Sequence, residues 1–66
     1  MEIIKRRVST NLKYYRNLKG LTQEKLAEKI AVSSIYISYL ERGLKIPSLT
    51  ILAKISAALN IDPSLF

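Results

Sequence analysis

Residues that favour turns are scarce in this chain, and their scarcity limits the folds open to it. Its 66 residues include only two glycines and two prolines, Gly20, Gly43, Pro47 and Pro63. An all-β fold would need a turn about every 8 to 12 residues, and such turns depend largely on these residue types. The sequence therefore predicts an all-α fold, and a chain this short has room for one domain, residues 1–66.

Apolar residues recur at helical spacing between these breaks. The first predicted helix covers about residues 3–18, and its inward stripe consists of Ile4, Val8, Leu12, Tyr15 and Leu18. Gly20 provides a left-handed position after it, and Thr22 is a suitable N-cap for a second helix that ends near Ile30. The inward residues of this second helix are Leu26, Ala27 and Ile30.

Serine N-caps predict two more helices. Ser33 begins a helix that ends at Gly43 and buries Val32, Ile37 and Leu40. Ser48 follows Pro47, which disfavours helix before it, and begins a fourth helix. The apolar residues of that helix are Leu49, Leu52, Ile55, Ala58 and Leu59. Asp62 before a proline caps the start of a fifth helix, so we expect a compact five-helix domain.

The residue types exclude most chemistry. The chain has 11 Lys and Arg against 5 Asp and Glu, a net charge of +6 that favours a polyanionic partner or a membrane surface. It has no cysteine or histidine, which removes disulfides, thiolate metal sites and the commonest general base. We therefore expect no enzyme activity, no catalytic residue, no metal, no cofactor and no small-molecule substrate.

Membrane association is not expected. No apolar run approaches the roughly 18 residues of a membrane span, and the N-terminal stretch lacks the apolar core of a signal peptide. A membrane-surface peptide would carry its basic residues on one long helix, whereas Gly20, Gly43 and Pro47 interrupt this chain. We expect a cytoplasmic protein.

Two short helices joined by a three-residue turn, within a basic domain, are the parts of a helix-turn-helix. In that motif one helix crosses the DNA backbone and the next enters the major groove. Many small bundles contain such a pair without binding nucleic acid, so the spacing alone leaves a structural role open.

Several short runs resemble the Cro/CI-type (XRE) helix-turn-helix family of phage repressors and related regulators. The resemblance covers residues 12–66 and rests on Arg16, Leu21-Thr22-Gln23-x-x-Leu26-Ala27, Val32-Ser33, Ile37-Ser38, Glu41-Arg42-Gly43 and Pro47-Ser48-Leu49. The chain also resembles the controller proteins of restriction-modification systems, which are small homodimers of this fold. The resemblance implies a five-helix lambda-repressor-like domain that binds double-stranded DNA and regulates transcription, as a repressor or an activator.

The residues that read DNA are expected on the third helix, with residues 34–41 as the recognition helix. Its outward side chains offer hydroxyls for base edges or phosphates and an alkyl group for a thymine methyl. With the N-cap, this set is Ser33, Ser34, Ile35, Tyr36, Ser38 and Tyr39. For Tyr36 and Tyr39 the alternative is packing on neighbouring helices. No Arg, Lys, Asn or Gln occurs between Ser33 and Leu40, so specificity must come from hydroxyls, methyl contacts, water and DNA shape.

Contacts to the DNA backbone are expected from three further residues. Gln23 lies in the first turn of the second helix, where its amide and the free backbone N–H groups could hold a phosphate, as the resemblance also implies. Arg42 and Lys45 follow the recognition helix and would meet the sugar-phosphate backbone. A solvated surface role is the alternative for each. For the basic run at residues 5–7 we favour that solvated role over contact with a flanking phosphate.

Two features are expected to be structural. Arg16 and Glu41 match positions that pair across the first and third helices in the family, and a partly buried bridge would fix the recognition helix. Ala31 stands where the family usually has glycine in the turn, and a left-handed alanine costs about 1 kcal/mol.

We expect a homodimer on a pseudo-palindromic operator, with its two recognition helices about 34 Å apart. The apolar residues Ile61, Leu65 and Phe66 support this, because one helical turn can hardly bury them within a monomer. The same residues could instead anchor a longer helix. The alternative function is an antitoxin-like protein-interaction module with secondary DNA binding.

Overall fold

Four α-helices and one short 3-10 helix make up the fold in the computed structural model, which describes residues 2–66. The elements are α1 (Glu2–Leu18), α2 (Gln23–Ile30), α3 (Ser34–Glu41), α4 (Leu49–Leu59) and the 3-10 helix η1 (Pro63–Leu65). The described residues contain no strand, so the all-α prediction is confirmed. The predicted fifth helix is only the single turn η1, capped by Asp62, whose carboxylate accepts from the Ser64 N–H.

The predicted N-caps form as expected. Each cap side chain accepts the backbone N–H three residues ahead, at 3.0 Å for Thr22, 3.1 Å for Ser33 and 3.2 Å for Ser48. These bonds satisfy donors that a helix start leaves free, and they fix where α2, α3 and α4 begin.

One core joins all four helices. Its buried residues are Leu12, Leu26, Ala27, Ile30, Ile37, Leu40, Ile55 and Leu59. Three residues predicted to face inward are instead exposed, Ile4 at 52%, Leu18 at 62% and Leu49 at 86%. All three lie in the terminal turns of their helices, where the apolar spacing continues beyond the region that neighbouring helices cover.

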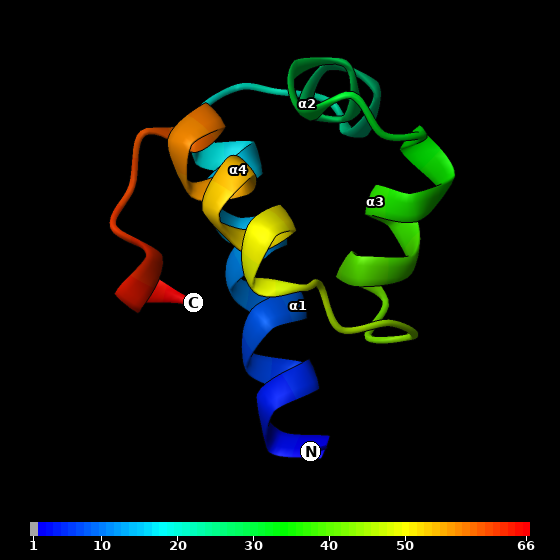
Figure 1. Ribbon diagram of the computed structural model, residues 1–66, viewed down its shortest axis with the longest axis vertical. Coiled ribbons are helices and arrows are strands. Elements are labelled where there is room, and N and C mark those ends of the chain that lie inside the picture. The colour runs from blue at the N-terminus through cyan, green and yellow to red at the C-terminus, as the bar shows by residue number, and fades with distance from the viewer. Residues whose placement is uncertain (1) are drawn as a thin grey trace.

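The helices are arranged so that α2 crosses one end of the bundle while α3 stands along its side (Figure 1). Helix α3 packs against both α1 and α2, and α2 also packs against α4. Both the position and the direction of α3 are therefore set by two other helices.

The C-terminal segment folds back onto α1. Arg7 Nε donates to the Phe66 carbonyl at 2.9 Å, and Asn11 Nδ2 donates to the Leu65 carbonyl at 3.0 Å. The Phe66 ring lies edge-on to Tyr15, with the ring centroids 6.3 Å apart. Ile61 and Phe66 are thus partly buried against the core within one chain, contrary to the expectation that a monomer could hardly cover them. Leu65 keeps 42% of its surface exposed.

Within residues 2–66, no helix is long and apolar enough to span a membrane.

Candidate nucleic-acid interface

The connection between α2 and α3 is the tight turn of a helix-turn-helix. Ala31 adopts the left-handed conformation, with φ 60° and ψ 45°, and ends α2. The Val32 N–H then donates to the Ala27 carbonyl at 3.0 Å, and Ser33 caps α3. Alanine therefore adopts the left-handed conformation that glycine would adopt without strain, at a cost of about 1 kcal/mol.

A buried ion pair fixes α3 against α1. Arg16 binds both carboxylate oxygens of Glu41, through Nε at 2.5 Å and Nη2 at 3.0 Å. Its remaining terminal nitrogen donates to the Leu21 carbonyl at 2.7 Å. The side chains are only 9% and 3% exposed, so this bridge is shielded from water. The expected structural role of the pair is confirmed, with the two-point geometry that best orients an arginine and a carboxylate.

Gln23 joins the same cluster. Its side-chain nitrogen Nε2 donates to Glu41 Oε1 at 3.1 Å, so the amide is held by the carboxylate at the end of α3. A primary amide has two N–H groups, so one bond to Glu41 uses only half of the donor capacity of Gln23. Sequence spacing did not indicate this bond, because Gln23 and Glu41 are 18 residues apart.

The predicted reading surface is only partly as expected. Ile35 is the most exposed apolar side chain of α3, at 62%, and Ser33 is exposed beside it. Ser34, Ser38 and Tyr39 are half-buried. Tyr36 does not point away from the core as predicted, since its ring packs against the core cluster. The reason is its place one turn before buried Leu40, at the edge of the apolar stripe.

The segment after α3 carries the two predicted backbone contacts. Arg42 ends α3 and is exposed. The Lys45 ammonium lies 5.8 Å from the centre of the Tyr39 ring, a cation–π distance that holds this lysine beside the last turn of α3.

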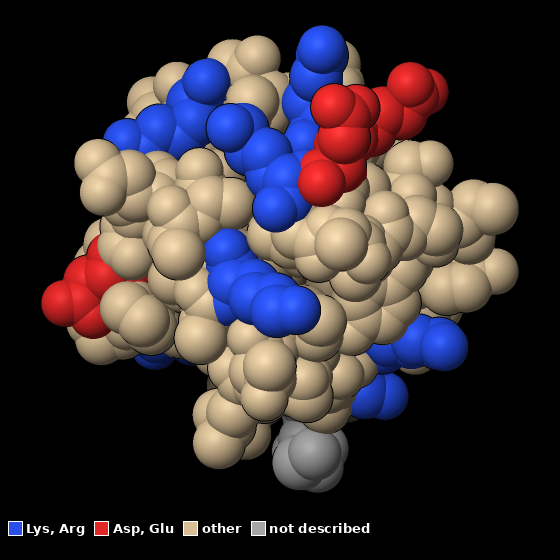
Figure 2. All heavy atoms as spheres, turned by 45° about the horizontal axis from the view of Figure 1, so that its top comes forward, with Lys and Arg blue, Asp and Glu red and all other residues tan. Residues whose placement is uncertain are grey.

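The positive charge is not confined to one area. Figure 2 shows Lys and Arg side chains in several separate groups over the visible face, with the acidic side chains gathered at two places near its margins. The net charge of +6 therefore favours an anionic partner without selecting the face that meets it.

Comparison with known proteins identifies the family. Residues 12–66 match the model of the HTH_3 family, described as helix-turn-helix. The chain is 40% identical over 56 residues to the HTH-type transcriptional regulator SinR of Bacillus subtilis, covering 83% of this chain and half of SinR. This chain thus spans half the length of that curated relative.

Solved structures agree with the family match. The restriction-modification controller protein C.AhdI of Aeromonas hydrophila superposes with a TM-score of 0.88 at 35% identity, covering 94% of this chain and 96% of that one. SinR, the master regulator for biofilm formation, was solved in complex with DNA, and it superposes with a TM-score of 0.81 at 38% identity. That match covers 86% of this chain and 92% of the SinR chain. The chain therefore belongs to the HTH_3 family of helix-turn-helix domains, the Cro/CI-type family that its sequence resembles.

Proposed function

We propose that this domain binds double-stranded DNA in a sequence-specific manner and regulates transcription, with α3 in the major groove. The observation that carries the proposal is the buried Arg16–Glu41 bridge with Gln23 bonded to it. It fixes the start of α2 relative to α3, which is the geometry a helix-turn-helix needs to hold a phosphate with one helix and read bases with the next. A relative solved in complex with DNA, SinR, supports it.

The proposed contacts fall into two classes. Gln23, Arg42 and Lys45 contact the sugar-phosphate backbone, which adds salt-dependent affinity. Base edges are read from α3 and its N-cap, by Ser33, Ser34, Ile35, Tyr36, Ser38 and Tyr39. Tyr36 is partly buried, so only the exposed part of its side chain is available for such a contact.

The proposed assembly is a homodimer on a pseudo-palindromic operator, with recognition helices about 34 Å apart in successive major grooves. DNA sequences that such a dimer selects should contain two inverted half-sites, and titration of the selected duplex should give two protein chains per duplex.

The test begins with selection of bound sequences from a random duplex pool. The selected duplex is then used to compare Ile35→Ala with Leu18→Ala by fluorescence anisotropy, because both residues are 62% exposed and both variants lose an apolar side chain. We expect Ile35→Ala to weaken binding to the selected duplex by about 1 kcal/mol, the scale of a lost thymine-methyl contact. Leu18→Ala should leave the binding free energy unchanged.

Two outcomes contradict the proposal. A pool that yields no enriched sequence excludes sequence-specific reading and favours a module that binds a protein partner. Equal losses by Ile35→Ala on selected and random duplexes place Ile35 outside the reading surface.

A further inference from the structure

A second group of basic side chains lies where the first half of α1 meets the end of α3. It lines a cleft of about 210 Å³ formed by Lys5, Arg6, Ser9, Arg42 and Gly43. Three of these five residues are cations, and none is a carboxylate. The sequence favoured a solvated role for Lys5 and Arg6, but the fold brings them together with Arg42, which is 36 or more residues away.

Ser9 and Gly43 bring α1 and the chain after α3 together in this cleft. Ser9 is buried, with 8% exposed, and its hydroxyl donates to the Arg6 carbonyl at 3.0 Å. A Cβ at Gly43 would lie 3.8 Å from this hydroxyl oxygen, at ordinary van der Waals distance. Gly43 also has a φ of +72°, a left-handed conformation that glycine adopts without strain. The chain after α3 therefore lies against α1 at Ser9, so Arg42 lines the same cleft as Lys5 and Arg6.

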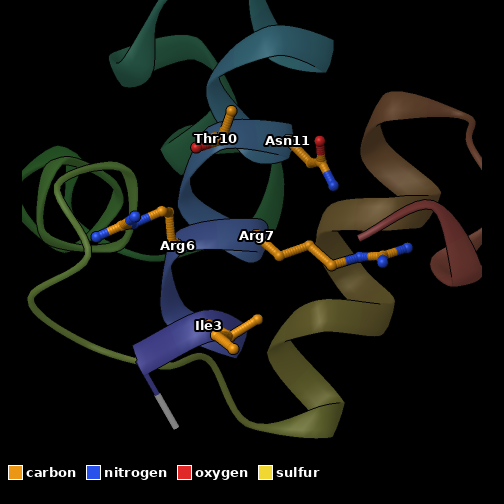
Figure 3. Close-up of a pocket in the computed structure, with 5 residues that line it drawn as sticks. All are labelled: Ile3, Arg6, Arg7, Thr10 and Asn11. Carbon is orange, nitrogen blue, oxygen red and sulfur yellow. The ribbon is translucent and has the colours of Figure 1, made fainter.

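Neighbouring arginines on α1 have different surroundings. Arg6 and Arg7 leave the helix toward opposite sides, Arg6 toward the connection between α3 and α4 and Arg7 toward the C-terminal segment (Figure 3). Arg7 donates to the Phe66 carbonyl, so it has a structural partner. Arg6 instead adds its charge to the cleft beside Arg42.

We propose that this cleft binds a phosphate group of the DNA backbone, on the same duplex whose groove receives α3. Arginine and lysine donors, with no carboxylate among the lining residues that the structure describes, match the charge and hydrogen-bonding needs of a phosphodiester. Its location favours DNA as the source of that phosphate, because Arg42 directly follows α3 and the sugar-phosphate backbone forms the wall of the groove. The inference rests on the proposed function and extends the DNA contact from α2 and α3 to α1.

The test measures how the affinity for duplex DNA depends on salt. Each phosphate contact contributes a slope of about −0.9 to the plot of log K against log salt concentration. We expect the double variant Lys5→Ala/Arg6→Ala to make this slope shallower by about 1 to 2, on selected and random duplexes alike. The matched control is Lys29→Ala/Lys54→Ala, which also removes two positive charges, but from a separate surface between α2 and α4. The control keeps the slope of the parent, and equal melting temperatures verify that both variants are folded.

The outcomes separate this inference from the proposed function. If the parent binds no duplex, the proposed function fails. If it binds, and the Lys5/Arg6 and Lys29/Lys54 variants show the same slope, the cleft makes no backbone contact and the inference is overturned. Titration with inorganic phosphate at constant ionic strength gives a further result. Binding by the parent that the Lys5/Arg6 variant loses, with unchanged slopes on DNA, assigns the cleft to a free anion and also overturns it.

Discussion

Replacing Arg16 with alanine removes the cation that compensates the buried carboxylate of Glu41. Glu41, with its side chain 3% exposed, loses two of its three hydrogen bonds and keeps only that from Gln23. The Leu21 carbonyl loses its bond from Arg16 as well. Breaking a buried pair by removing one partner costs about 3 to 5 kcal/mol. Domains of this size are stabilised by about 3 to 10 kcal/mol in total, so the variant should lose much of its stability.

The assay is thermal unfolding followed by circular dichroism. A cost of about 3 kcal/mol corresponds to a fall in melting temperature of more than 10 °C in so small a domain. Arg6→Ala is the matched control, because it removes the same side chain from an exposed position on the same helix, and its melting temperature should stay near that of the parent.

The double variant Arg16→Met/Glu41→Leu separates the loss of a pair from the stranding of a charge. Apolar residues of similar volume leave no buried charge, so this variant should recover much of the stability that Arg16→Ala loses. The reasoning is refuted if Arg16→Ala melts within about 2 °C of the parent, since a stranded buried carboxylate cannot cost so little.

Three further predictions concern the turn between α2 and α3, the helix α3 and the C-terminal segment. Ala31→Gly should raise stability by about 0.5 to 1 kcal/mol, because glycine occupies the left-handed position without strain, and a lower melting temperature would contradict this. Tyr36→Ala should cost about 1 to 2 kcal/mol of stability by removing a ring packed on the core, whereas Tyr36→Phe keeps that packing; equal melting of the two variants would show that the ring contributes nothing. The N–H of Ser64 bonds the Asp62 carboxylate and, with the Ser64 side chain, holds the pKa of Asp62 below its ordinary value. The resulting stabilisation is present above the ordinary pKa and is lost as the pH falls through the lowered one, so Asp62→Ala should flatten the acid limb of melting temperature against pH, and an unchanged limb would count against it.

Local patterns predicted the helices well because caps and periodicity act over a few residues. Thr22, Ser33 and Ser48 each bond the N–H three positions ahead, a distance visible in the sequence itself. Periodicity failed at Leu49, since a helical pattern does not show where neighbouring helices stop covering it.

The site was harder to predict where it depends on tertiary contacts. The family resemblance indicated the pairing of Arg16 and Glu41, but nothing in the spacing linked Gln23 to that carboxylate. The basic cleft was not predicted for the same reason, because Arg6 and Arg42 line one cleft only through the packing of α1 against α3. The sequence pattern predicted Tyr36 on the outer face of α3, whereas this residue lies at the border between that face and the core.

The carboxylate of Glu41 has a consequence for how DNA would be recognised. It connects α1, α2 and α3 through Arg16 and Gln23, so the angle between α2 and α3 is set without any bound duplex. Such preorganisation spares the ordering entropy that flexible binders lose on association. A rigid protein surface also leaves the deformation to the DNA. Duplexes that bend or narrow easily at the required steps would then be preferred even where no side chain touches a base.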